Sequence, residues 1–224
     1  MERTWDTIID MYCDMKNMET YNQIKKLKIS GRQFSHLPKL PNTLTELSCI
    51  LHNLSFLPEL PNTLTHLNCS YGKILSLPSL PNTLTHLECF NNSLSKLPDL
   101  PNTLIHLECA YNKLSSLPNL PNTLTYLSCC SNQLSSLPDL PNTLKDLRCN
   151  NNKLSELPKL PNTLTYLQCS NNKLFGLPDL PNSITWFICS NNLFNSGNIL
   201  LQKFFRIYWT IYKKITGLFI LYCF

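Results

Sequence analysis

Apolar and polar residues follow one another along the chain in a pattern that repeats every twenty residues. From Pro41 onward, the pattern Pro-Asn-Thr-Leu-x-x-Leu-x-Cys-x-x-Asn-x-Leu-x-x-Leu-Pro-x-Leu returns eight times. In the copy at residues 84–103, positions 86–90 alternate between outward and inward, which predicts a short strand. Pro98 and Pro101 exclude a helix interior or a central strand in the rest of that copy, and they favour an extended, polyproline II-like segment. Each copy therefore predicts one turn of chain, with a strand on one side and an extended return on the other.

A single turn of this kind is too small to bury its own leucines, whereas stacked turns bury them together. We expect successive strands to pair in parallel at a spacing of about 4.8 Å. The predicted fold class is therefore a repeat solenoid. Residues 21–40 form a degenerate first repeat, and residues 41–198 contain eight regular twenty-residue repeats.

The core of each copy, Leu-x-x-Leu-x-Leu-x-x-Asn-x-Leu with cysteine in place of the third leucine, resembles the leucine-rich repeat family. The short unit and its Leu-Pro-x-Leu-Pro segment look like the bacterial-effector subclass. The cysteine-containing, asparagine-rich copies are also similar to repeat proteins of large DNA viruses of amoebae. The resemblance covers about residues 24–194. It implies a leucine-rich repeat horseshoe with parallel β-strands on the concave face and extended segments on the convex face, and it does not indicate a partner.

A column of asparagines follows the predicted strands. Its members are Asn92, Asn112, Asn132, Asn152, Asn172 and Asn192. We expect their amides to bond the backbone groups that the bend leaves free, and also to bond one another. Arg32, His52 and Gly72 occupy this column in the first copies, which predicts looser turns there.

Eight of the eleven cysteines occupy one inward column, from Cys49 to Cys189 at intervals of twenty residues. A zinc site needs thiols that converge on one point, whereas these lie along a line. Disulfides between adjacent turns are an alternative. The absence of a recognisable secretory signal instead favours reduced thiols that pack as small apolar groups. Cys130 falls at an outward position by alternation, so we expect it to react with alkylating reagents.

The composition indicates a folded chain built on leucine. The chain has 44 leucines, 26 asparagines and 16 prolines, and 43% apolar with only 15% charged residues excludes a disordered chain. Residues 41–198 carry eight basic and nine acidic side chains, so we predict no continuous basic face and no nucleic-acid partner.

No catalytic constellation is recognisable in the sequence. We find no Ser/His/Asp triad, no paired acids and no Gly-rich phosphate loop, so we predict no enzyme activity, no catalytic residues and no cofactor. His66, His86 and His106 follow one another in an outward column, where aligned histidines suit metal binding or a response to pH. The alternative, which we favour, is duplication of one exposed residue without a metal site.

The outward strand positions vary between copies and form the candidate binding surface. Aromatic and charged side chains on a rigid face suit a protein interface. The predicted protein-binding residues of the concave face are His66, His86, Glu88, Phe90, His106, Glu108, Tyr111, Tyr126, Asp146, Arg148, Tyr166 and Trp186. We therefore expect a non-enzymatic scaffold for a protein partner of unknown identity. The alternative is that these positions drift without a function.

Both ends of the chain are predicted to cap the exposed core of the solenoid. Residues 1–20 have apolar residues at helical spacing, and residues 199–224 are basic and aromatic, so each segment predicts a short capping helix. A spanning helix is disfavoured in the tail, because lysines would lie in the middle of the membrane. The alternative function is a membrane-peripheral adaptor that uses this tail. Its predicted membrane contacts are Lys203, Arg206, Trp209, Lys213 and Lys214.

The N-terminus has no basic start followed by an apolar stretch, so we predict no secretory signal. We expect a monomer in the cytoplasm, which is the host-cell cytoplasm if the protein is viral. Peripheral membrane association is the alternative.

Overall fold

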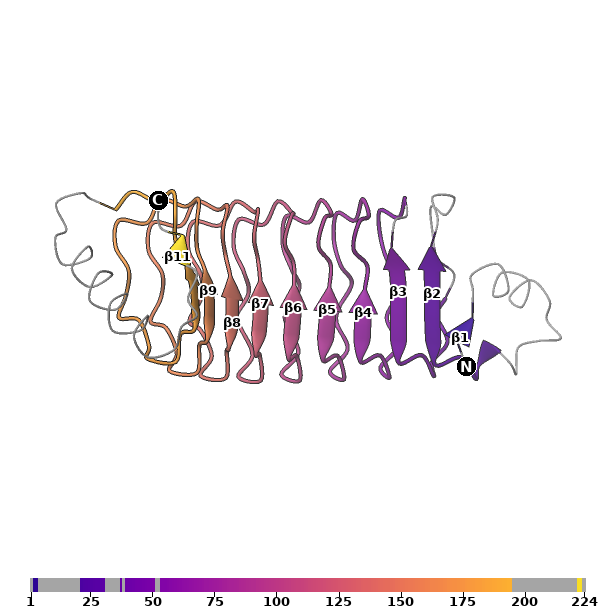
Figure 1. Ribbon diagram of the computed structural model, residues 1–224. Helices are drawn as coiled ribbons and strands as arrows, with labels where there is room; N and C mark the ends of the chain where they lie inside the picture. The colour runs from indigo at the N-terminus through magenta and orange to yellow at the C-terminus, as the bar shows by residue number, and fades with distance from the viewer. Residues whose placement is uncertain are drawn as a thin grey trace.

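The strands of the protein lie side by side in one long sheet (Figure 1). The computed structural model describes residues 2–3, 21–30, 37, 39–50, 53–194 and 221–222. Its strands are β1 (Glu2–Arg3), β2 (Lys26–Ser30), β3 (Glu46–Ile50), β4 (His66–Asn68), β5 (His86–Glu88), β6 (His106–Glu108), β7 (Tyr126–Ser128), β8 (Asp146–Arg148), β9 (Tyr166–Gln168), β10 (Trp186–Ile188) and β11 (Leu221–Tyr222).

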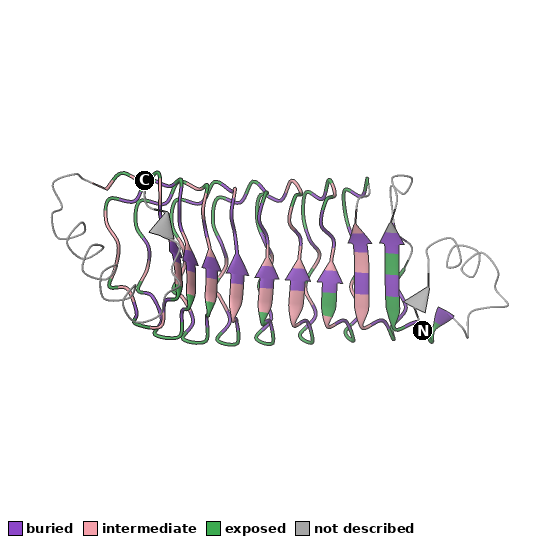
Figure 2. Ribbon diagram, in the orientation of Figure 1, coloured by how far each residue is buried: buried purple, intermediate pink, exposed green. Residues whose placement is uncertain are grey.

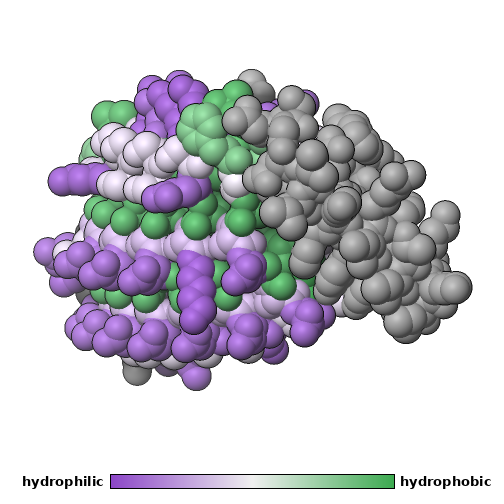
Figure 3. Space-filling model, turned by 90° about the vertical axis from the view of Figure 1, so that its left-hand side faces the viewer, coloured by the Kyte–Doolittle hydropathy of each residue, from purple (hydrophilic) through white to green (hydrophobic). Residues whose placement is uncertain are grey.

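All neighbouring strands are parallel, and their order in the sheet follows the sequence from β1 to β11. From β2 to β10, paired residues are twenty positions apart, as in the pairing of Leu87 with Leu107. Because the register equals the repeat length, each residue stacks on its equivalent in the next turn. Polar and apolar residues therefore form separate rows on the surface (Figure 3). The predicted parallel solenoid is confirmed, with about eight regular turns.

The core is a continuous stack of leucine and cysteine side chains. In β5, Leu87 is fully buried between the half-buried His86 and Glu88. Buried residues recur at the centre of the strands along the sheet (Figure 2). Burying one leucine side chain contributes about 1.5–3 kcal/mol, so stacking of the turns is the main source of stability. The predicted inward positions are confirmed.

The chain returns from each strand to the next on the opposite side of the solenoid (Figure 1). Each return ends in a tight turn, in which the Leu84 amide, for example, donates to the Pro81 carbonyl at 3.0 Å. Within residues 53–194 the return segments contain neither helix nor strand. Their polyproline II geometry stays a prediction.

The asparagine column ties each bend to the preceding turn. Asn112 is buried, and its Oδ1 accepts a hydrogen bond from the Leu94 amide at 3.0 Å. Its Nδ2 donates to the carbonyls of Cys89, Cys109 and Ala110 at 3.0, 3.2 and 3.2 Å. The same two-turn bonding recurs at Asn92, Asn132, Asn152, Asn172 and Asn192.

The predicted bonding of these asparagines to the backbone is confirmed. Their predicted bonding to one another is wrong, because the backbone groups of two turns already occupy both amide atoms. Arg32 and His52, which were predicted to loosen the first turns, lie outside the described residues.

A threonine column also joins successive turns, a role that the sequence analysis did not predict. Thr103 Oγ1 donates to the carbonyls of Asn82 and Leu84 in the preceding turn, at 2.9 and 2.8 Å. This arrangement recurs in each turn from Thr43 to Thr163. The recurrence of threonine in the Pro-Asn-Thr motif was the available signal.

The sheet continues at both ends into segments for which the sequence predicts helices. β1 pairs with β2, and β11 pairs with β10. Residues 2–3 and 221–222 are thus strands, because an added strand satisfies the backbone groups of an otherwise open sheet edge. The rest of both predicted capping helices lies outside the described residues. In the part of the chain that the structure describes, no helix is long and apolar enough to cross a membrane.

The described cysteines are free and buried. Burial raises the pKa of the ladder thiols well above the ordinary value of a thiol, as at Cys89. Cys130 lies in an outward column, but the expectation that its thiol is accessible is wrong. This residue is only 8% exposed, and its thiol contacts Asn150 Oδ1 of the next turn. Burial is also the main cause that raises the pKa of Cys130.

We expect Cys130 and the eight ladder cysteines from Cys49 to Cys189 to resist iodoacetamide in the native protein, because the reactive species is the thiolate. Mass spectrometry after brief labelling measures this protection. Labelling in concentrated urea, where all of these thiols should react, is the control. Rapid modification of Cys130 or Cys109 without denaturant would contradict the packing.

Candidate functional site

The predicted binding residues lie on one surface of the sheet. We use the name strand face for the outward positions of β2–β10 together with the residues that directly follow these strands. Phe90 and Tyr111 follow β5 and β6, and the other predicted residues lie within β4–β10. His66 and Tyr111 are exposed, whereas the rest are half-buried. The structure thus brings these residues together, and their role in binding stays a prediction.

Aromatic rings stack along the strand face at the first position of the strands. Ring centroids are 4.3 Å apart between His66 and His86, 5.6 Å between His86 and His106, and 4.2 Å between His106 and Tyr126. Tyr166 and Trp186 stack at 5.9 Å. The spacing of neighbouring strands, about 4.8 Å, is close to a ring-stacking distance. The register of the parallel sheet therefore produces the stack directly.

Arg148 continues this stack where Asp146 replaces a ring. Its guanidinium binds both carboxylate oxygens of Asp146, at 3.1 and 3.0 Å. Its central carbon lies 5.4 Å from the ring centroid of Tyr126 and 4.6 Å from that of Tyr166. The hydrogen bonds to Asp146 are the main cause that raises the pKa of Arg148. A planar cation thus bridges the two groups of rings, and we call the series from His66 to Trp186 the ring ladder.

An acidic pair lies beside the ring ladder, at the last position of two adjacent strands. Glu88 of β5 is the register partner of Glu108 of β6. Glu88 Oε2 accepts a hydrogen bond from Asn68 Nδ2 at 2.5 Å, and Glu108 Oε2 accepts one from the Tyr126 hydroxyl at 2.9 Å. Both donors are neutral, so they orient the carboxylates without cancelling their charge.

A second group of aromatic residues lies on the other side of the acidic pair. Phe90 follows Glu88 by two residues, and its ring meets that of Tyr71 edge to face at 4.7 Å. Tyr71 and Tyr111 have positive φ angles of 59° and 54°, which non-glycine residues rarely adopt. Their rings are 45% and 61% exposed. The same position has a positive φ in each turn from Tyr71 to Asn191, so the bend of the repeat places these two large exposed rings beside the strands.

Burial favours the neutral forms of His86, His106 and Tyr126 in the ring ladder. Burial lowers the pKa of His86, and the adjacent histidines lower it further. Burial also lowers the pKa of His106, against the opposing influence of the two glutamates. Burial and then the charge of Glu108 raise the pKa of Tyr126.

We expect the folded protein to lose stability as the pH falls below about 6.5. His86 and His106 have a lower pKa in the fold than in the unfolded chain, so the unfolded chain binds more protons in this range. The contribution of these two histidines to stability is complete above their pKa in the unfolded chain. It is lost as the pH drops toward their pKa in the folded protein. Urea unfolding across this pH range measures the decline. The stability of the variant His86→Gln/His106→Gln should decline less over the same pH range. An equal decline would contradict the assignment of the pH dependence to these two histidines.

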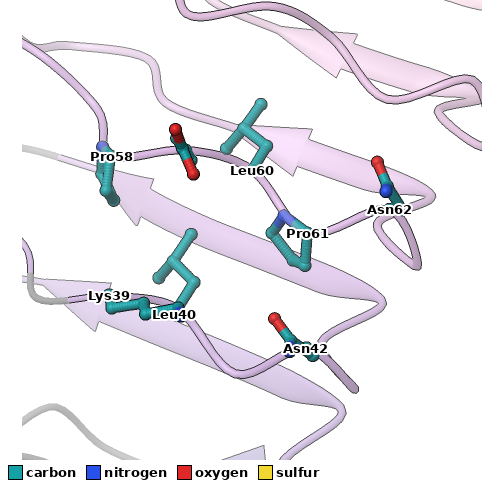
Figure 4. Close-up of a pocket in the computed structure, with 8 residues that line it drawn as sticks. Lys39, Leu40, Asn42, Pro58, Leu60, Pro61 and Asn62 are labelled. Carbon is teal, nitrogen blue, oxygen red and sulfur yellow. The ribbon is translucent and has the colours of Figure 1, made fainter.

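Hollows on the return side are a product of the repeat. One of about 540 Å³ lies between the returns at 39–42 and 58–62 and is lined by Leu40, Leu60 and Pro61 among others (Figure 4). An equivalent hollow of about 560 Å³ lies between the returns at 76–82 and 96–101. A smaller hollow of about 190 Å³ lies on the strand face over β2–β5. In the described ranges, no group of three or more His, Cys, Asp or Glu residues is placed to hold a metal ion.

Asn68, a polar residue of the strand face, was missed by the sequence analysis. Asn68 orients Glu88, and its Oδ1 also accepts a hydrogen bond from the Ser70 amide at 3.1 Å. The stacking role of Arg148 was not predicted either, although its position two residues after Asp146 placed both side chains on the outward side. Strand alternation was the signal that could have paired these two residues.

These features define the class of protein, which is a solenoid of short, twenty-residue leucine-rich repeats. No protein-family model matches the chain, and no curated protein matches it. Among solved structures, YopM from Yersinia enterocolitica is 38% identical, with a TM-score of 0.72 over 77% of this chain and 38% of that chain. A Shigella effector leucine-rich repeat domain is 26% identical, with a TM-score of 0.68 over 96% of this chain and 88% of that chain.

A third similar structure shares the cysteine column. The functional domain of InlJ from Listeria monocytogenes, which includes a cysteine ladder, is 28% identical, with a TM-score of 0.68 over 83% of this chain and 43% of that chain. This chain therefore corresponds to less than half of the YopM and InlJ chains. The similarity to bacterial leucine-rich repeat proteins agrees with the sequence analysis, and the similarity to proteins of amoebal viruses stays a prediction.

The five residues predicted to contact a membrane lie outside the described residues. They are Lys203, Arg206, Trp209, Lys213 and Lys214. Their contact with a membrane stays a prediction.

Proposed function

We propose that the protein is a scaffold that binds a protein partner through its strand face, which forms the concave side of the solenoid. The observation that carries this proposal is the ring ladder, which runs from His66 to Trp186 and is bridged by Arg148. The similarity to an effector leucine-rich repeat domain of Shigella supports it.

The ring ladder suits binding because its side chains are ordered before a partner arrives. Each ring is held between neighbours on the adjacent strands, so little side-chain entropy is left to lose on association. Tyrosine, tryptophan and arginine are also the residues that most often dominate the energy of protein interfaces. Stacked rings expose their edges, which offer imidazole nitrogens and tyrosine hydroxyls to a partner.

We also propose that the protein acts without catalysis, as a monomer in the cytoplasm. Two pairs of oppositely charged groups on the strand face are engaged with each other in structural contacts. Lys26 and Glu46 form an ion pair at 2.7 Å, and Arg148 and Asp146 form another at 3.0 Å. No described residue favours the membrane-peripheral alternative.

Site-specific photo-crosslinking tests the proposed surface. A photoreactive amino acid placed at Tyr111, on the strand face, should crosslink a defined protein in extracts of the native cells. The same amino acid placed at Ser116 or Ser136, exposed positions on the return side, should give no such product. Crosslinking to the same protein from all three positions, or only from the return side, would contradict the proposal.

A further inference from the structure

We infer that the middle of the strand face, over β4–β7, receives a basic segment of the partner protein. A lysine or arginine side chain of that segment lies against the carboxylates of Glu88 and Glu108. The inference rests on the proposed function, because it specifies the chemistry of the partner that the same surface binds. It is carried by charge, by hydrogen bonding and by the aromatic residues on both sides of the acidic pair.

The acidic pair has no compensating cation. Over β4–β7 and the residues that follow these strands, the described strand face contains no lysine or arginine. Arg148, two strands from Glu108, is bound to Asp146 through both carboxylate oxygens. Lys28 lies on β2, three strands from Glu88. Burial favours the neutral forms of His86 and His106, as argued above. Like charges on register partners destabilise a sheet, so the surface gains when a positive group reaches this pair.

The two carboxylates are also oriented in advance. Asn68 holds one oxygen of Glu88, and Tyr126 holds one oxygen of Glu108. The second oxygen, Oε1, accepts no hydrogen bond from any described residue in either case. Adjacent strands place the two side chains about 4.8 Å apart at their bases, so a single ammonium or guanidinium group can contact both.

Aromatic rings flank the acidic pair on both sides. The ring ladder passes through His86 and His106 at the first position of the same strands. Phe90 and the exposed Tyr111 follow those strands on the other side. A cation that contacts the carboxylates therefore lies between aromatic side chains, and contact with the face of the exposed Tyr111 ring adds to the binding energy.

Ser70 provides an independent sign that this region is incomplete without a partner. It lies in the same outward column as Phe90, one turn earlier, and it is fully buried. Its hydroxyl has no hydrogen-bond partner in the described structure, and an unpaired buried hydroxyl is costly.

Other occupants fit this region less well. Nucleic acid and anionic lipid headgroups are negatively charged, so the uncompensated carboxylates repel them. A divalent metal ion prefers a larger set of oxygen or nitrogen ligands, and the described residues hold no such group. A basic polypeptide meets both the charge and the aromatic surroundings.

NMR titration of the full chain with short peptides tests the inference. The peptides share one length and alternate threonine with lysine, with glutamine or with glutamate. The lysine peptide should shift the signals of residues 86–90 and 106–111, and its binding should weaken as salt is added. The glutamate peptide should not bind. No shift with the lysine peptide at millimolar concentration, or shifts confined to the return side, would overturn the inference. Shifts of these signals with calcium chloride but not with the lysine peptide would also overturn the inference.

Glu88→Gln/Glu108→Gln removes both charges with little change in shape. This variant should bind the lysine peptide about tenfold more weakly, and its Tm should be equal to or higher than that of the wild type. The matched control Glu59→Gln/Glu156→Gln removes two exposed charges from the return side and should bind normally. Equal weakening by both variants would overturn the inference. If the glutamine peptide binds the strand face of the wild type as tightly as the lysine peptide does, this inference fails while the proposed function stands.

Discussion

Replacement of Leu107 by alanine is expected to lower the free energy of unfolding by about 2–5 kcal/mol. Leu107 is the central residue of β6 and is fully buried, with the equivalent leucines of β5 and β7 as its register partners. The change removes apolar contacts and leaves a cavity that two neighbouring turns cannot fill, because their backbones are fixed by the ladder of hydrogen bonds. Urea unfolding followed by circular dichroism measures the loss.

His106→Ala is the matched control for Leu107→Ala, because the two residues are adjacent in β6 and face opposite sides. His106 is half-buried and stacks on His86 and Tyr126, so its loss should cost less than about 1.5 kcal/mol. Equal losses for the two variants would mean that the assignment of the inward and outward faces is wrong.

Asn112→Ala should lower the free energy of unfolding by about 1–3 kcal/mol. The change leaves the buried Leu94 amide without a described acceptor, and such an unsatisfied group costs about 1–3 kcal/mol, whereas the Cys89 carbonyl keeps its second donor, Asn92 Nδ2. The loss should appear as a lower urea midpoint. The substitution should also accelerate hydrogen exchange at the Leu94 amide, because it removes the only described acceptor of that amide.

Asn102→Ala is the control for Asn112→Ala. Asn102 also recurs in every regular repeat, but its side chain is exposed in the turn before the strand. We expect its replacement to change the free energy of unfolding by less than about 0.5 kcal/mol. A loss of stability as large as that of Asn112→Ala would contradict this account. It would mean that the stability contribution of an asparagine does not depend on its hydrogen bonds to two turns.

The twenty-residue period made most of the fold predictable. A register equal to the repeat follows from stacking identical turns, and strand alternation then assigns Leu107 inward and His106 outward. The outward positions follow from the same argument, so the sequence also located the candidate surface. These features depend on columns of equivalent residues, and the columns can be read directly from the chain.

Features that depend on contacts between different columns were not predictable in the same way. Alternation places Cys130 outward, but Asn150 of the next turn covers its thiol. Arg148 lies beside the ring column, and only its bonds to Asp146 bring the guanidinium between Tyr126 and Tyr166. The end strands β1 and β11 lie outside the repeat, so no column indicates their pairing.

The affinity of the crosslinked partner for variants of the two sides tests the central claim most directly. Tyr126→Ala/Tyr166→Ala removes two rings from the strand face, and Ser116→Ala/Ser136→Ala changes two exposed positions on the return side. Calorimetric titration of the folded variants with the partner gives the Kd. We predict a Kd at least about tenfold higher for the tyrosine variant and an unchanged Kd for the serine variant. An unchanged Kd for the tyrosine variant, with weaker binding by the serine variant, would contradict the claim that the strand face is the binding surface.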